Sequence, residues 1–142
     1  MKRVQKMKPS RQTMIHFYQQ LGKLFYSAAS VDKTVHEEEM AQLKEIVKKE
    51  WLPLENSLSE FGDDAAYQIE IVFDWLVEND WNIGKIIPDF EIFKKEHPHL
   101  FTSQVNDLIL KTAKAIINSF SGKNKSESAL IEKLRRLLYQ KH

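Results

Sequence analysis

Two acidic positions around the start of a predicted helix are the residues in this chain most able to do chemistry. Asp32 lies in a turn after a helix-patterned run, and Glu39 follows seven positions later. Carboxylate oxygens are the ligands that hard divalent cations of the Ca²⁺ or Mg²⁺ type prefer. If Asp32 and Glu39 converge across the turn, they can hold such a cation, with Glu38 or His36 as an auxiliary ligand.

Local folding chemistry is the alternative explanation of the same acidic residues. Thr34 and Glu37 fit a capping box, in which each side chain satisfies a backbone N–H at the start of a helix. Acidic residues in a first helical turn are also favoured by the helix dipole. Capping accounts for the glutamates but not for Asp32, which lies outside the box. The spacing is not that of an EF-hand, because the sixth loop position is Glu37 and not glycine.

The segment that carries these residues is similar to a known family. Residues 26–40, YSAASVDKTVHEEEM, resemble the motif of the TerB-like (tellurite-resistance) family. In that motif an alanine-rich helix runs into an Asp-Gly turn, and a glutamate follows seven positions after the aspartate. Asp32 and Glu39 have this spacing, although Lys33 replaces the glycine. The later segment INSFSGKNKSESALIEKL, residues 117–134, resembles the second helix-loop-helix copy of the family.

The resemblance implies a compact all-α fold with an acidic, metal-binding site. It also implies a non-catalytic role in the response to tellurite and other stress. The first pair of helices and the last pair share an arrangement that indicates a degenerate internal duplication, and convergent amphipathicity explains that arrangement equally well.

Length and composition place the chain among small globular proteins. At 142 residues with 42% hydrophobic residues, it is long enough to bury a core as one domain. The absence of cysteine excludes disulfides, thiolate zinc sites and a cysteine nucleophile. No apolar run is long enough to span a bilayer, and no secretory-type segment follows the basic N-terminus. We therefore expect a cytoplasmic protein.

Charge is distributed unevenly along the chain although the net charge is only +1. Residues 31–100 hold 17 acidic and 7 basic residues, whereas residues 101–142 hold 3 acidic and 8 basic residues. If the fold keeps these blocks apart, their field can steer a charged partner. The alternative is a set of solvated helix faces that cancel one another. The low net charge argues against nucleic-acid binding.

Helical periodicity predicts an all-α bundle of about six helices over residues 10–142, preceded by a basic arm at residues 1–9. Ser10 and Ser103 are the predicted caps of two long helices. Pro53 is predicted to stop a helix over residues 34–51, and a short helix is predicted over residues 88–96, with Phe90 and Phe93 facing inward. Residues 65–77 are apolar on nearly every side, which predicts the central, buried helix, with a strand as the rival interpretation.

Partner binding is the second functional hypothesis. A helical interaction module without a ligand would present its acidic middle, or Trp81, to another protein or to a second copy of itself. The tryptophans are expected to be core or helix-end aromatics, as for Trp51 and Trp75. Trp81 is the one expected to be exposed, because it lies in a polar turn. Catalysis is not expected, since no acid–base pair has the required spacing.

Overall fold

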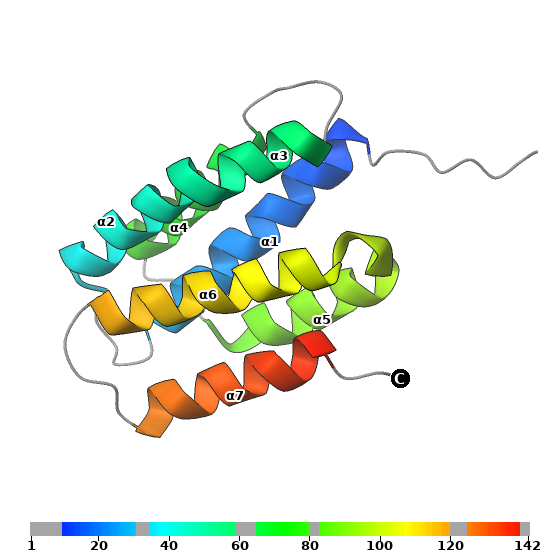
Figure 1. Ribbon diagram of the computed structural model, residues 1–142. Coiled ribbons are helices and arrows are strands. Elements are labelled where there is room, and N and C mark those ends of the chain that lie inside the picture. Colours follow the sequence, from blue (N-terminus) through cyan, green and yellow to red (C-terminus); the bar gives the residue numbers. More distant parts are fainter. Residues whose placement is uncertain (1–9, 31–34, 59–64, 80–82, 120–124, 140–142) are drawn as a thin grey trace, which may run out of the picture.

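The predicted all-α bundle of about six helices is confirmed (Figure 1). The structure, a computed structural model, describes residues 10–30, 35–58, 65–79, 83–119 and 125–139. These residues are almost entirely helical and contain no strand. The α-helices are α1 (Arg11–Ala29), α2 (Glu37–Ile46), α3 (Leu52–Leu58), α4 (Gln68–Asn79), α5 (Ile86–Glu96), α6 (Ser103–Ser119) and α7 (Lys125–Tyr139).

Helix α1 is the centre of the bundle. It packs against α4, α5 and α6, and Figure 1 shows it running between them. The predicted cap is confirmed, since the Ser10 hydroxyl oxygen accepts a hydrogen bond from the backbone N–H of Thr13 at 3.0 Å. Leu21, Leu24 and Phe25 are 0% exposed. Neighbouring helices therefore cover α1 on several sides, and it supplies a large share of the core.

The segment at residues 65–77 is helical, but the prediction that it is the central helix is wrong. A 3₁₀ turn, Ala65–Tyr67, leads into α4. Ile69, Phe73 and Leu76 are buried, and α4 packs mainly on α1. Ile71 and Trp75 lie on the opposite side of the helix and are exposed. All-round apolarity therefore marks a surface helix with an apolar outer side rather than a helix enclosed by others.

Helix α2 does not stop before Pro53, so that prediction is also wrong. A π-helical segment, Val47–Trp51, joins α2 to α3 as one continuous rod. The backbone N–H of Leu52 donates to the Val47 carbonyl oxygen, five residues back. Proline lacks an N–H and crowds the carbonyl four residues before it. The wider π turn relieves this conflict, so the rod continues to Leu58.

Two helix starts differ from the predicted caps. Helix α2 begins at Glu37 with His36 as its N-cap, three residues later than predicted, so the capping box of Thr34 and Glu37 is wrong. Helix α6 begins at Ser103, and the residue that caps it is Thr102. The Thr102 hydroxyl oxygen accepts a hydrogen bond from the Val105 N–H at 3.2 Å.

The last helices of the chain complete the core. Phe90 and Phe93 of α5 point inward, as predicted, and form a ring cluster with Phe17 and Phe101. Helix α6 packs against α1, α2 and α7. The first pair is α1 with α2, and the last pair is α6 with α7. Helix α7 packs on α6 of its own pair, whereas α2 packs on α6 of the other pair, so the two pairs do not make equivalent contacts. The internal duplication stays a prediction.

Candidate functional site

The predicted acidic site lies before and within the first turn of α2. Glu39 is 2% exposed, and its Oε1 accepts a hydrogen bond from the backbone N–H of His36 at 2.8 Å. Glu37 and Glu38 are exposed. Asp32, the predicted principal ligand, lies outside the described residues. Of the four predicted metal ligands, the structure therefore places the carboxylate of Glu39 against the main chain of His36 and leaves Glu38 exposed.

The contact between His36 and Glu39 is a helix cap. They are the first and last residues of a capping box, in which the N-cap and the third helical residue support each other. Burial of Glu39 is tolerated because the carboxylate accepts a main-chain hydrogen bond near the positive end of the helix dipole. Within the described ranges, no three His, Cys, Asp or Glu side chains gather in a way that could hold a metal ion. The metal site stays a prediction.

The predicted partner residue, Trp81, lies outside the described residues. Trp75 of α4 is the tryptophan that the structure shows at the surface, with 53% of its area exposed. The prediction that Trp75 is a core or helix-end aromatic is wrong. Trp51, by contrast, is 0% exposed, as predicted for a core residue.

Trp75 belongs to a row of three exposed apolar side chains. Tyr67 is 40% exposed, Ile71 56% and Trp75 53%. Ile71 and Trp75 are four residues apart on α4 and lie on one side of it, and Tyr67 lies four residues before Ile71, at the end of the 3₁₀ turn that leads into α4. We call these three residues the outer face of α4. The sequence contains the pattern of this outer face, since Tyr67, Ile71 and Trp75 form a second apolar row beside the core row of Ile69, Phe73 and Leu76.

An acidic row runs beside the outer face. Glu70, Asp74 and Glu78 are also spaced four apart, and each lies three residues after a member of the outer face. Lys44 of α2 forms an ion pair with Asp74, with 3.7 Å between Nζ and Oδ2. Burial raises the pKa of Glu70 above its ordinary value; Lys44 opposes this rise, and the charge of Asp74 adds to it. The site therefore combines apolar surface with closely spaced carboxylates.

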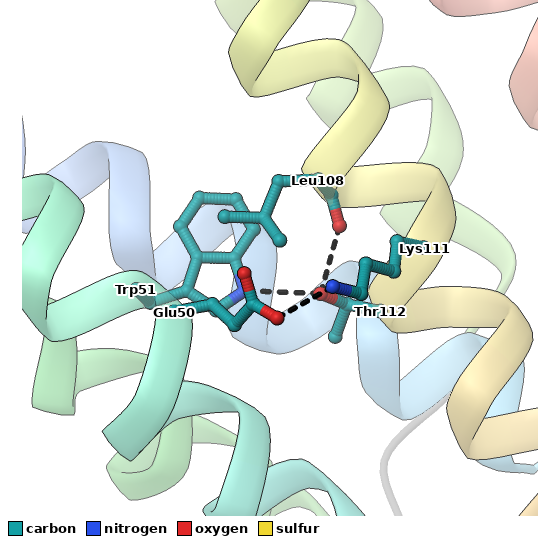
Figure 2. Close-up of polar contacts among 5 residues, drawn as sticks. All are labelled: Glu50, Trp51, Leu108, Lys111 and Thr112. Carbon is teal, nitrogen blue, oxygen red and sulfur yellow. Dashed lines mark hydrogen bonds and ion pairs between the residues drawn. The ribbon is translucent and has the colours of Figure 1, made fainter.

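A second polar cluster joins the rod of α2 and α3 to α6 (Figure 2). The Trp51 indole Nε1 donates to the Thr112 hydroxyl at 3.0 Å, and that hydroxyl donates to the Leu108 carbonyl oxygen at 2.8 Å. Lys111 Nζ lies 2.5 Å from Glu50 Oε2. These contacts satisfy a buried indole and pair two surface charges, so we interpret them as structural.

Two open grooves lie along α6. One, of about 460 Å³, includes Glu50, Leu54 and Lys111 among its lining residues. The other, of about 790 Å³, is lined by Asp107, Leu110, Lys111, Lys114, Arg135 and Tyr139. Two polar contacts join lining residues: Tyr139 donates a hydrogen bond to Asp107, and Lys111 pairs with Glu50. Such pairing stabilises the packing of α6 on its neighbours.

The carboxylate of Glu55 is enclosed between α3 and α1. Glu55 of α3 is 1% exposed, and its Oε1 accepts a hydrogen bond from the Tyr18 hydroxyl at 2.8 Å. Tyr18 is itself 0% exposed. A carboxylate without access from solvent cannot meet a substrate in this conformation, so the pair ties α3 to α1.

Comparison with known proteins adds no relative to this picture. The chain matches no family model, no curated protein and no solved structure. Among the helices that the structure describes, none has both the length and the apolarity needed to cross a bilayer.

Proposed function

We propose that this chain is a non-catalytic helical module that binds another protein through the outer face of α4. The observation that carries the proposal is the single row of Tyr67, Ile71 and Trp75, exposed by 40%, 56% and 53%. Contiguous apolar surface rimmed by polar residues is typical of interaction sites. Tryptophan and tyrosine are also enriched among the residues that dominate binding energy at interfaces.

The packing of α4 supports this proposal. Ile69, Phe73 and Leu76 hold the helix against α1, so its outer face is presented on a rigid element. A rigid helix with apolar residues four apart matches the anchor spacing by which helices bind to grooves or to other helices. Little conformational entropy is lost when such a preformed surface binds.

Exposure of a single apolar residue would not support the same proposal. Ile92 of α5 is 56% exposed, the same fraction as Ile71, but no other residue of α5 is among the large exposed apolar side chains. Isolated residues of this kind are ordinary on protein surfaces. Ile92 is therefore a matched control for Ile71.

Quantitative affinity capture of the full chain from its native cell, with crosslinking, tests the proposal. Ile71→Ala and Trp75→Ala should each reduce recovery of the partner by about tenfold or more, the loss typical of an interface anchor. Ile92→Ala should leave recovery unchanged. Circular dichroism of each variant checks that the helices are intact. Equal recovery of the partner by the parent and all three variants would contradict binding through the outer face of α4.

A metal-binding stress-response role of the TerB type is the second proposal, and one observation favours it. Of the three consecutive glutamates, Glu39 has the spacing of the family motif, and it alone is buried. Its carboxylate is held against the segment that follows Asp32 in the chain. Under this proposal Asp32 and Glu39 hold a divalent cation of the Ca²⁺ or Mg²⁺ type.

A further inference from the structure

The charges around the outer face of α4 narrow the chemistry of its partner. Helix α4 carries three acidic residues and no basic residue. Glu70, Asp74 and Glu78 form one row, and on the helix surface each is the neighbour of Tyr67, Ile71 or Trp75 at a spacing of three residues. A partner that covers the apolar row therefore comes within reach of all three carboxylates.

Within the described part of the chain, neighbouring helices neutralise this acidic row only in part. Lys44 is 3.7 Å from Asp74, and both side chains of this ion pair are about half exposed, at 50% and 41%. A half-exposed pair at this distance is weak, so a second cation can still approach Oδ2 of Asp74, whereas its Oδ1 is buried. Glu70 is half-buried, and this burial raises the pKa of its carboxyl. A cationic side chain of a partner would stabilise the ionised form of Glu70.

The same charges disfavour three other occupants. A second copy that pairs its α4 with this α4 would bring like-charged rows together, which is unfavourable. The phosphates of nucleic acids and the headgroups of anionic membranes would meet the same repulsion. A polypeptide with cationic side chains beside its apolar ones has the complementary pattern.

We propose that the outer face of α4 binds a basic amphipathic helix of another protein; this inference rests on the proposed function. Apolar side chains of that helix would cover Ile71 and Trp75. Its Lys or Arg side chains would pair with Glu70, Asp74 and Glu78. The apolar contacts would supply most of the affinity, and the ion pairs would select the partner and accelerate association.

The experiment is selection from a displayed library of random peptide helices with the full-length chain as bait. We expect the enriched peptides to carry apolar residues three or four apart and a positive net charge. A second selection uses Trp75→Ala as bait and should fail to enrich them. Each synthesised peptide is then titrated at low and high salt, and binding should weaken as salt rises.

Matched charge variants complete the test. The triple variant Glu70→Gln/Asp74→Asn/Glu78→Gln removes the acidic row without changing side-chain size, and it should weaken the selected peptides by about tenfold. The control is Asp89→Asn/Glu91→Gln/Glu96→Gln, which changes net charge equally on α5 and should leave binding unchanged.

The outcomes separate the two proposals. Enrichment of neutral or acidic peptides that depends on Trp75 overturns the basic partner and leaves the interaction module standing. Enrichment that does not depend on Trp75, or no enrichment, overturns both. Self-association that Ile71→Ala abolishes in sedimentation experiments identifies a second copy as the occupant, and Trp75-dependent binding to phosphatidylglycerol vesicles identifies a membrane; either result overturns the inference.

Discussion

Gly22 of α1 lies directly against Ile69 of α4. A Cβ added at Gly22 would lie 2.7 Å from the carbonyl oxygen of Ile69 and 3.0 Å from the Cβ of Val72. A backbone oxygen cannot move aside without moving α4. This contact fixes how closely the two helices approach and, with it, the position of the outer face of α4.

Gly22→Ala should therefore destabilise the protein by about 1–3 kcal/mol, the usual cost of overpacking. At an open helical position the same change would stabilise by up to about 1 kcal/mol, because alanine favours helix more than glycine does. The sign of the change in the free energy of unfolding, measured by urea denaturation, therefore shows whether Gly22 contacts α4 this closely. A rise in stability would show that α1 and α4 do not approach as closely as described.

Thr112→Val tests the link between the π-helical segment and α6. Valine has nearly the size of threonine but cannot accept the hydrogen bond of the Trp51 indole. Because both residues are buried, the unpaired N–H should lower the free energy of unfolding by about 1–3 kcal/mol.

Two companion variants isolate this hydrogen bond. Thr112→Ser keeps the hydroxyl and should lose less stability than Thr112→Val. In a Trp51→Phe background the cost of Thr112→Val should shrink, since the indole N–H is gone. Equal costs in both backgrounds would contradict the assignment. Urea denaturation monitored by circular dichroism measures all of these.

Glu39→Ala tests the cap of α2. Loss of the acceptor for the His36 N–H should lower stability by about 1–2 kcal/mol, as for other helix caps. Glu39→Gln keeps an acceptor and should lower it by less than about 1 kcal/mol. Glu38→Ala, an exposed neighbour, should have the smallest effect of the three. A larger loss for Gln than for Ala would refute the capping role.

The metal prediction is separate from the capping prediction. If Asp32 and Glu39 hold a divalent cation, Ca²⁺ or Mg²⁺ should raise the melting temperature of the parent, because a ligand that binds only the folded state stabilises it. Asp32→Ala and Glu39→Gln should abolish that rise, although Glu39→Gln keeps the cap. Thermal shift and calorimetric titration measure this. If millimolar metal does not change the melting temperature, the TerB-type site is refuted.

How much could be foreseen from the sequence depended on how local each feature is. Ser10 as a cap and Phe90 and Phe93 as core residues are set by a few neighbouring positions, and they were predicted correctly. Pro53 was misjudged because the π-helical segment that accommodates it has no sequence signature. The capping box consists of His36 and Glu39 rather than the predicted Thr34 and Glu37. The sequence did not indicate this, because histidine is not among the preferred N-cap residues.

The candidate site was missed for a tertiary reason. Periodicity shows that residues 65–77 have two apolar rows, but it cannot show how many helices cover them. Ile69 and Phe73 face α1, whereas no helix packs closely over Ile71 and Trp75 in the described part of the chain. Exposure therefore depends on where the other helices lie, which local sequence does not encode.

The carboxyl of Glu70 should make stability depend on pH. Burial raises its pKa above the ordinary value of 4.5, so the folded state binds this proton more tightly than the unfolded state does. The contribution of Glu70 to stability is therefore greatest at low pH and is lost as pH rises through the raised pKa. The glutamine of Glu70→Gln does not titrate. The free energy of unfolding of this variant, minus that of the parent, should therefore increase with pH from about 4 upward and level off above the raised pKa of Glu70.

Two neighbours of Glu70 provide the internal check. Asp74→Asn removes a like charge that raises the pKa of Glu70, so the pH-dependent gap between the parent and Glu70→Gln should narrow in that background. Lys44→Met removes the opposing cation, so the gap should widen. Urea denaturation at a series of pH values gives the six curves, one with and one without Glu70→Gln in each of the three backgrounds. Parallel curves for the parent and Glu70→Gln would show that burial does not perturb this carboxyl.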